Sequence, residues 1–121
     1  MNIITLDADA LQRLRDLDPD GKTRLLERVL EAFETSAARL SRQLLTARES
    51  GDMKSVRLVA HTLKSSSASI GALALARLCA EIEDQLRSAD DTGLSQRLDA
   101  MDHELTAVLQ TLRTLCKGAQ P

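Results

Sequence analysis

Residues 22–49 read KTRLLERVLEAFETSAARLSRQLLTARE, and no glycine or proline interrupts them. Apolar residues recur along this stretch in steps of three and four, at Leu26, Val29, Leu30, Phe33, Ala37, Leu40 and Leu44. This spacing places them in one stripe along an α-helix. Glutamates and arginines fill the remaining faces. The stretch therefore predicts a long amphipathic helix over about 22–49.

Glycines divide the rest of the chain into similar segments. They stand at 21, 51, 71, 93 and 118, between runs rich in Leu, Ala, Arg, Glu and Gln, which favour helix. We expect a short helix over about 7–17 and longer helices over about 53–70, 72–88 and 94–116. Asp7 and Asp52 are candidate N-caps, and Lys117-Gly118 is typical of a helix end.

The later helices also carry apolar stripes. The expected inward-facing residues are Val56, Val59, Ala60, Leu63, Ser67 and Ile70, then Leu75, Leu78, Cys79, Ile82 and Leu86, and finally Leu94, Leu98, Met101, Leu105, Val108, Leu112 and Leu115. Four long amphipathic helices with short connections predict an all-α, antiparallel four-helix bundle with a short additional N-terminal helix. We expect one domain over residues 1–121.

Composition excludes several classes of protein. The 121 residues include 16 basic and 18 acidic ones, for a net charge of −2, and a single aromatic residue, Phe33. Few strand formers argue against an all-β or parallel α/β fold. The charge balance and the lack of aromatics argue against nucleic-acid binding. No apolar run is long enough to span a bilayer, and the start does not resemble a signal peptide, so we expect a cytoplasmic protein without membrane insertion.

The two cysteines and one of the two histidines have ordinary interpretations. Cys79 and Cys116 are isolated, and we expect buried or half-buried thiols instead of a disulfide or a zinc site. His103 lies between Asp102 and Glu104, outside the apolar stripe of its helix, and is assigned to solvent.

The segment 54–70 differs from the other helices. Beside its apolar stripe runs a second stripe, made of Lys54, Arg57, Leu58, His61, Lys64, Ser65 and Ala68. Ser65 and Ala68 leave the imidazole of His61 above a surface without bulky side chains. We expect this surface to accept the active site of another protein.

His61 is the candidate functional residue of this stripe. Lys64, three residues on, shares its face and can contact a dianion carried by the imidazole. Neither a metal-ligand spacing nor a Ser-His-Asp arrangement nor a glycine-rich phosphate loop is evident in the sequence, so no metal site is predicted. The pattern favours a histidine that holds a group over one that performs hydrolysis.

Residues 60–83, AHTLKSSSASIGALALARLCAEIE, resemble the histidine-containing phosphotransfer (HPt) domains of bacterial multistep phosphorelays. The matching features are the Ala-His-x-Leu-Lys core, the run of small residues, Ile70-Gly71-Ala72 and the helix that follows. The order of the other helices also agrees, so the resemblance covers nearly the whole chain.

The resemblance implies roles for individual residues. His61 would accept a phosphoryl group from a receiver-domain aspartate and pass it to another receiver domain, with Lys64 offsetting its charge. Ser65 stands where many members have glycine. Glu83 would bind the other imidazole nitrogen and fix the tautomer; the alternative is a solvent-exposed residue beside Arg87.

The resemblance also implies partners. They would be receiver domains of response regulators and of a hybrid histidine kinase, whose acidic sites the cations Lys54, Arg57 and Lys64 complement, with Leu58 and Ala68 as apolar contacts. Magnesium is expected on the receiver and no cofactor on this chain, which would be a monomeric carrier without kinase activity. Both a free-standing protein, slightly favoured by the initial methionine, and a piece of a hybrid kinase fit this interpretation.

Two other functions are compatible with a helical bundle. One is an adaptor that binds a receiver domain or another regulator without carrying phosphate. The other, weaker one is a fragment of a dimerising histidine kinase, although 121 residues contain no recognisable ATP-binding domain.

Overall fold

Five helices make up the computed structural model, which describes residues 6–118 and the side chains of residues 6–114. The helices are α1 (Ala8–Asp16), α2 (Leu25–Ser50), α3 (Met53–Ser69), α4 (Leu73–Arg87) and α5 (Leu94–Gly118). No strand occurs among the described residues. None of the described helices has the length and apolar character needed to cross a membrane.

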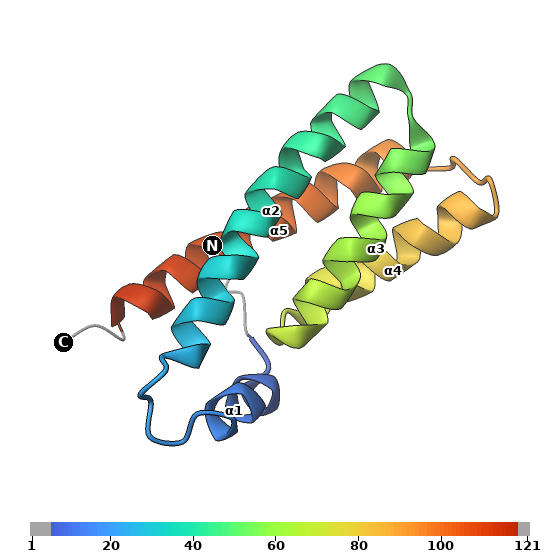
Figure 1. Cartoon of the computed structure of the whole chain (residues 1–121). Coiled ribbons are helices and arrows are strands. Elements are labelled where there is room, and N and C mark those ends of the chain that lie inside the picture. Colours follow the sequence, from blue (N-terminus) through green and yellow to red (C-terminus); the bar gives the residue numbers. More distant parts are fainter. Residues whose placement is uncertain (1–5, 119–121) are drawn as a thin grey trace.

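The four long helices run antiparallel to their neighbours along the chain (Figure 1). Helix α3 packs against α2 and α4, and α5 closes the bundle by packing against α4 and α2. The short α1 contacts α2 near the end of the bundle where α2 begins. The predicted four-helix bundle with a short N-terminal helix is therefore confirmed.

The turn between α2 and α3 follows the local sequence. Gly51 adopts a left-handed conformation with φ of 72°, and the next amide, of Asp52, donates to the carbonyl of Ala47 at 2.9 Å. This is a common way to end a helix, and glycine takes that conformation without a steric cost. Asp52 then caps α3, because its carboxylate accepts from the backbone amide of Ser55 at 3.2 Å.

Helix α2 begins at Leu25, later than the predicted Lys22. Asp18 explains the difference, because its carboxylate accepts from the backbone amides of Thr23 at 3.4 Å and Leu25 at 3.1 Å. A carboxylate from the preceding turn thus holds residues 22–24 outside the helix. It satisfies a first-turn amide that has no partner within the helix.

Gly71, between α3 and α4, is in close contact with the chain before α1. The backbone amide of Asp7 donates to the carbonyl of Gly71 at 2.8 Å. Gly71 has a φ of +81°, and a Cβ placed on it would lie 2.7 Å from the amide nitrogen of Asp7. Only glycine fits here, and the contact ties the start of α1 to the turn that joins α3 and α4.

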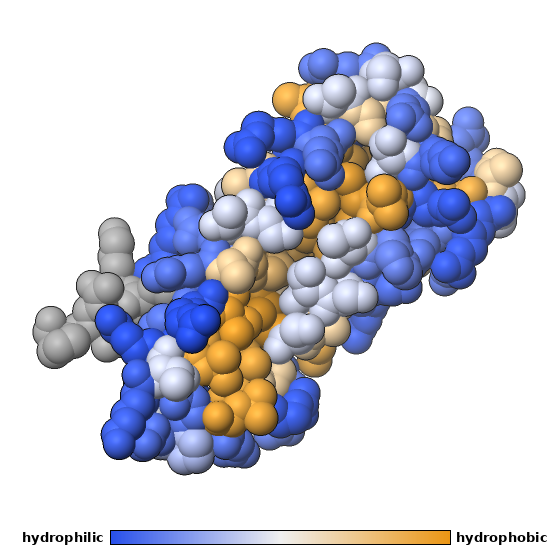
Figure 2. Space-filling model, in the orientation of Figure 1, coloured by the Kyte–Doolittle hydropathy of each residue, from blue (hydrophilic) through white to orange (hydrophobic). Residues whose placement is uncertain are grey.

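The core is one cluster of side chains from all four long helices. The stripe predicted for α3 is buried, as are the inward residues of α5 that the structure describes. Leu115 and Cys116 lie outside the described side chains. Cys79 is buried and unpaired, as expected. On the face shown in Figure 2, apolar surface remains visible between α2 and α3, bordered by hydrophilic side chains.

Candidate functional site

His61 lies on the outward face of α3 and is held from below by Glu83 of α4. Its side chain is 57% exposed, whereas that of Glu83 is only 5% exposed. The Nδ1 atom of His61 lies 2.7 Å from Oε2 of Glu83. The alternative of a solvent-exposed Glu83 is therefore wrong, and the imidazole has one nitrogen engaged with a buried carboxyl group.

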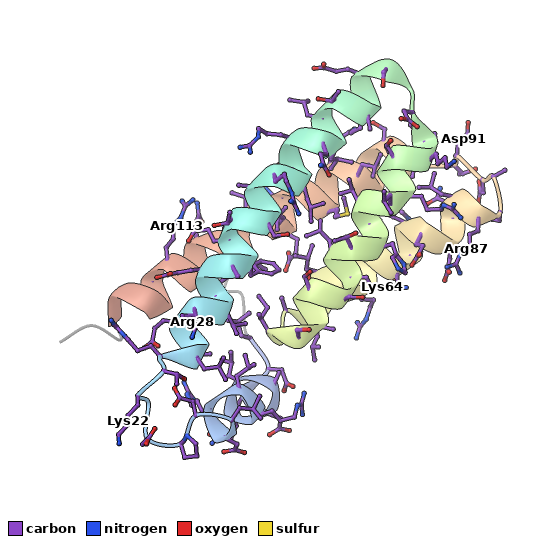
Figure 3. All side chains as sticks on the ribbon, viewed as in Figure 1. Lys22, Arg28, Lys64, Arg87, Asp91 and Arg113 are labelled. Atoms are coloured by element: carbon purple, nitrogen blue, oxygen red, sulfur yellow. The ribbon has the colours of Figure 1, made fainter. Side chains whose placement is uncertain are left out.

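Three side chains share the carboxylate of Glu83. Lys64, one turn after His61, donates from Nζ to Oε1. Arg87, one turn along α4, donates to Oε2 at 3.2 Å and lies 3.6 Å from Asp84. Lys64 lies on α3 and Arg87 on α4 (Figure 3), so the two cations reach the carboxylate from different helices. Glu83 thus links the two helices through a buried anion with two cationic partners.

The electrostatics of this cluster keep Glu83 ionised. The hydrogen bond from Lys64 is the largest influence on its pKa; burial opposes it, and the hydrogen bond from His61 supports it. The pKa of Glu83 is lowered as a result from 4.5 to about 2. An ionised carboxylate only accepts hydrogen bonds, so Nδ1 of His61 carries the hydrogen and donates it. The lone pair then lies on Nε2, which makes that nitrogen the nucleophilic one.

Lys64 and Arg87 both form ion pairs with Glu83, a role that the sequence did not predict for either residue. Lys64 was expected beside a phosphoryl group, and the structure shows its ammonium bound to Glu83 on the same face as His61. Arg87 appeared in the sequence only as an alternative neighbour of Glu83. The structure brings Glu83 together with both His61 and Arg87. The spacing of four residues between Glu83 and Arg87 is the sequence signal for this pair.

A groove of about 370 Å³ opens beside the imidazole. It is lined by Lys54, Ser55, Arg57, Leu58, His61 and Glu83. Leu58 is 65% exposed and lies beside charged side chains of this groove, so it offers apolar contact area next to the imidazole. Four members of the stripe predicted on α3 therefore line one groove: Lys54, Arg57, Leu58 and His61.

Beyond His61 the surface is formed by small residues. Ser65 and Ala68 are both exposed, as the sequence predicted. Ser67 is completely buried, consistent with close packing of α3 on its neighbours. No bulky side chain of α3 stands outward in the two turns after the imidazole apart from Lys64, so the ring is open to approach from that side.

The remaining cysteine and histidine side chains that the structure describes do not extend this site. Burial raises the pKa of the Cys79 thiol to about 12, which leaves it unreactive. His103 is exposed on α5, as assigned. In the part of the chain that the structure describes, no cluster of His, Cys, Asp and Glu side chains could hold a metal ion. Gln85 is buried and donates to the carbonyl of Thr92 at 2.7 Å; its structural role was not anticipated.

Comparisons with known proteins agree with this architecture. Histidine-containing phosphotransfer protein B from Pseudomonas aeruginosa PAO1 has a similar structure, with a TM-score of 0.83, 24% sequence identity and coverage of 95% of this chain and 96% of that one. A putative histidine-containing phosphotransfer protein from rice gives a TM-score of 0.78 at 21% identity, covering 93% of this chain and 79% of that one. No curated protein has a significant sequence match to the chain.

The sequence also matches the family model for the Hpt domain over residues 25–113, which include α2, α3, α4 and most of α5. Members of this family are phosphoryl carriers in multistep phosphorelays and exchange the group with receiver domains; they are not kinases. The match extends over most of the chain and contains the His61–Glu83 pair. The chain belongs to the Hpt domain family and is a phosphorelay carrier.

Proposed function

We propose that His61 is the phosphoacceptor of this carrier. Nε2 attacks the phosphorus of an aspartyl phosphate on a receiver domain, so that an N–P bond forms as the O–P bond breaks. The electron pair of the broken bond remains on the released aspartate carboxylate. Attack by the aspartate of a second receiver reverses these changes and regenerates the imidazole. The observation that carries this proposal is the contact between Nδ1 of His61 and the buried Glu83.

Glu83 and Lys64 assist this step in different ways. The attack leaves the hydrogen on Nδ1 and places positive charge on the ring, and the ionised carboxylate of Glu83 stabilises that charge. Lys64, which lies on the same face, offsets the charge of the phosphoryl group. Arg87 retains its contact with Glu83 when Lys64 turns toward the phosphoryl group, so the carboxylate stays paired.

The surface around His61 forms the proposed docking site for receivers. Leu58 and Ala68 supply apolar contact, Ser65 leaves room, and Lys54 and Arg57 attract an acidic partner. The magnesium ion belongs to the receiver, which contributes most of the charge stabilisation that phosphoryl transfer needs. The proposed partners are receiver domains of a hybrid kinase and of response regulators. The proposed carrier is a monomer and acts in the cytoplasm.

A transfer assay tests the proposal. The protein is incubated with a receiver domain that carries a radiolabelled aspartyl phosphate, and the label is followed on both chains. We expect acid-labile, base-stable label on the wild-type protein and on His103→Gln, which changes another exposed histidine, and none on His61→Gln. Label on His61→Gln would refute the proposal. Binding of the receiver without any transfer would show an adaptor instead of a carrier.

A further inference from the structure

A second groove lies on the other side of Leu58, between α2 and α3. Its volume is about 500 Å³, and Ser55 and Leu58 belong to both grooves. From α2 it is lined by Arg39, Arg42, Gln43, Thr46, Ala47 and Ser50. Leu58 therefore stands between the groove at His61 and the groove at α2. Apolar surface bordered by hydrophilic side chains is visible between these two helices (Figure 2).

Two arginines give the second groove its charge. Arg39 and Arg42 are exposed, and neither makes an ion pair with any residue that the structure describes. By contrast, Arg48 on the same helix lies 2.9 Å from Asp99, and Arg113 lies 2.8 Å from Glu34. The only acidic residue in the groove is Asp52, whose carboxylate is engaged by Ser55 at the start of α3. The groove therefore presents two cations that form no ion pair with the carboxylates that the structure describes.

The size of a docking interface favours the use of both grooves. A specific protein complex covers about 800 Å² on each partner, with roughly 20 or more residues. Six residues line the groove at His61, so a docked protein must extend beyond it. On the α2 side the surface continues without interruption, because Leu58 and Ser55 border both grooves.

We infer that Arg39 and Arg42 of α2 form the outer half of the receiver-docking surface, with Leu58 at its centre. The inference rests on the proposed function, since the occupant is the receiver that exchanges its phosphoryl group with His61. Such a partner brings an aspartyl phosphate and the acidic side chains that hold its metal ion. The two arginines raise the rate of encounter with the receiver and the affinity for it, and they have no contact with the reacting atoms.

Charge reversal tests this inference on the full chain. In Arg39→Glu/Arg42→Glu, we expect kcat/KM for transfer from a phosphorylated receiver to fall about tenfold at low ionic strength, with the rate at saturating receiver changed less than about twofold. The difference in kcat/KM between the wild type and Arg39→Glu/Arg42→Glu should shrink as the salt concentration is raised, because exposed charges are screened. Arg39→Lys/Arg42→Lys, which keeps both charges, should transfer nearly as well as the wild type.

Arg13→Glu/Arg15→Glu is the matched control, because it makes the same charge change on α1, at the other end of α2 (Figure 1). An equal loss in both double variants would overturn the inference, since only net charge would then matter. An unchanged kcat/KM in Arg39→Glu/Arg42→Glu would also overturn the inference. The same holds if sedimentation shows that the wild type is a homodimer and that the only effect of the two substitutions is to dissociate it. If the wild type takes no label, the proposed function fails; weaker binding of the same receiver to Arg39→Glu/Arg42→Glu would still support the docking role.

Discussion

Nδ1 of His61 and Oε2 of Glu83 lie 2.7 Å apart, and this contact joins the exposed face of α3 to a buried carboxylate on α4. The carboxylate is the acceptor that fixes the ring tautomer, and it is also the anion shared by Lys64 and Arg87. Changes at Glu83 should therefore affect both the reactivity of the imidazole and the packing of α3 on α4.

Replacing Glu83 with alanine should slow phosphotransfer at least about tenfold, because Nδ1 loses the acceptor that fixes the tautomer. The free energy of unfolding should fall by about 1–2 kcal/mol. Lys64 and Arg87 lose their partner, but both side chains can still reach solvent, and this limits the loss of stability. Transfer rates, urea unfolding and the ¹⁵N shifts of the His61 ring check these effects. A ring spectrum identical to that of the wild type would contradict the role of Glu83.

Stability should depend on pH through Glu83. Its pKa is lowered in the folded protein from 4.5 to about 2, so the folded state favours the ionised form. The resulting stabilisation is complete above about pH 4.5 and is lost as the pH falls through about 2. Urea unfolding of the wild type and Glu83→Gln across pH 2–6 tests this. The difference in stability between the two proteins should narrow in acid, and a difference that is constant over this range would contradict the prediction.

Lys64→Ala should slow transfer by several-fold or shorten the lifetime of the phosphohistidine, because the ammonium that offsets the phosphoryl charge is removed. Glu83 should remain ionised through Arg87, so the fold should be retained. Rapid-quench transfer and decay of the isolated phosphoprotein measure the two effects. Lys22→Ala changes an exposed lysine in the turn before α2 and serves as the control. Unchanged kinetics in Lys64→Ala would remove Lys64 from the site.

Ser65→Leu should block receiver docking far more than it disturbs folding. Ser65 is exposed on the surface beyond His61, so the bulky side chain meets the partner and not the core. We expect the unfolding free energy to change by less than about 0.5 kcal/mol and KM for the phosphorylated receiver to rise about tenfold. Thr106→Leu, at an exposed position of α5, is the matched control. Normal transfer by Ser65→Leu would refute the steric role of the small residues.

Gly71→Ala should destabilise the protein by more than Gly51→Ala. Both glycines have positive φ, of +81° and +72°, so both substitutions incur the cost of a left-handed conformation, about 1 kcal/mol. A Cβ at Gly51 meets nothing within 4 Å, whereas at Gly71 it collides with the backbone of Asp7. Thermal unfolding of the two variants separates the two effects. Equal losses of stability would contradict this prediction, because they would mean that the backbone at Asp7 moves away from the new Cβ without a loss of folding free energy.

The sequence predicted the bundle well because apolar spacing within a helix is a local property. The buried stripe of α3 and the candidate His61 could both be identified from residues 54–70 alone. The start of α2 was misplaced because Asp18 acts across seven residues to cap Leu25. The hydrogen bond from Lys64 to Glu83 and the contact between Asp7 and Gly71 depend on how separate elements meet in space, which helical periodicity does not encode.

The turn at Gly71 also sets the register of the two helices that build the site. His61 lies ten residues before Gly71 and Glu83 twelve residues after it, so at about 1.5 Å per residue both lie at nearly the same height above the turn. One residue inserted in α4 before Glu83 would rotate the carboxylate by about 100° around the helix axis, away from the imidazole. Insertions between α4 and α5 would leave this register unchanged. The site therefore depends on the number of residues between His61 and Glu83 as well as on the identity of these two residues.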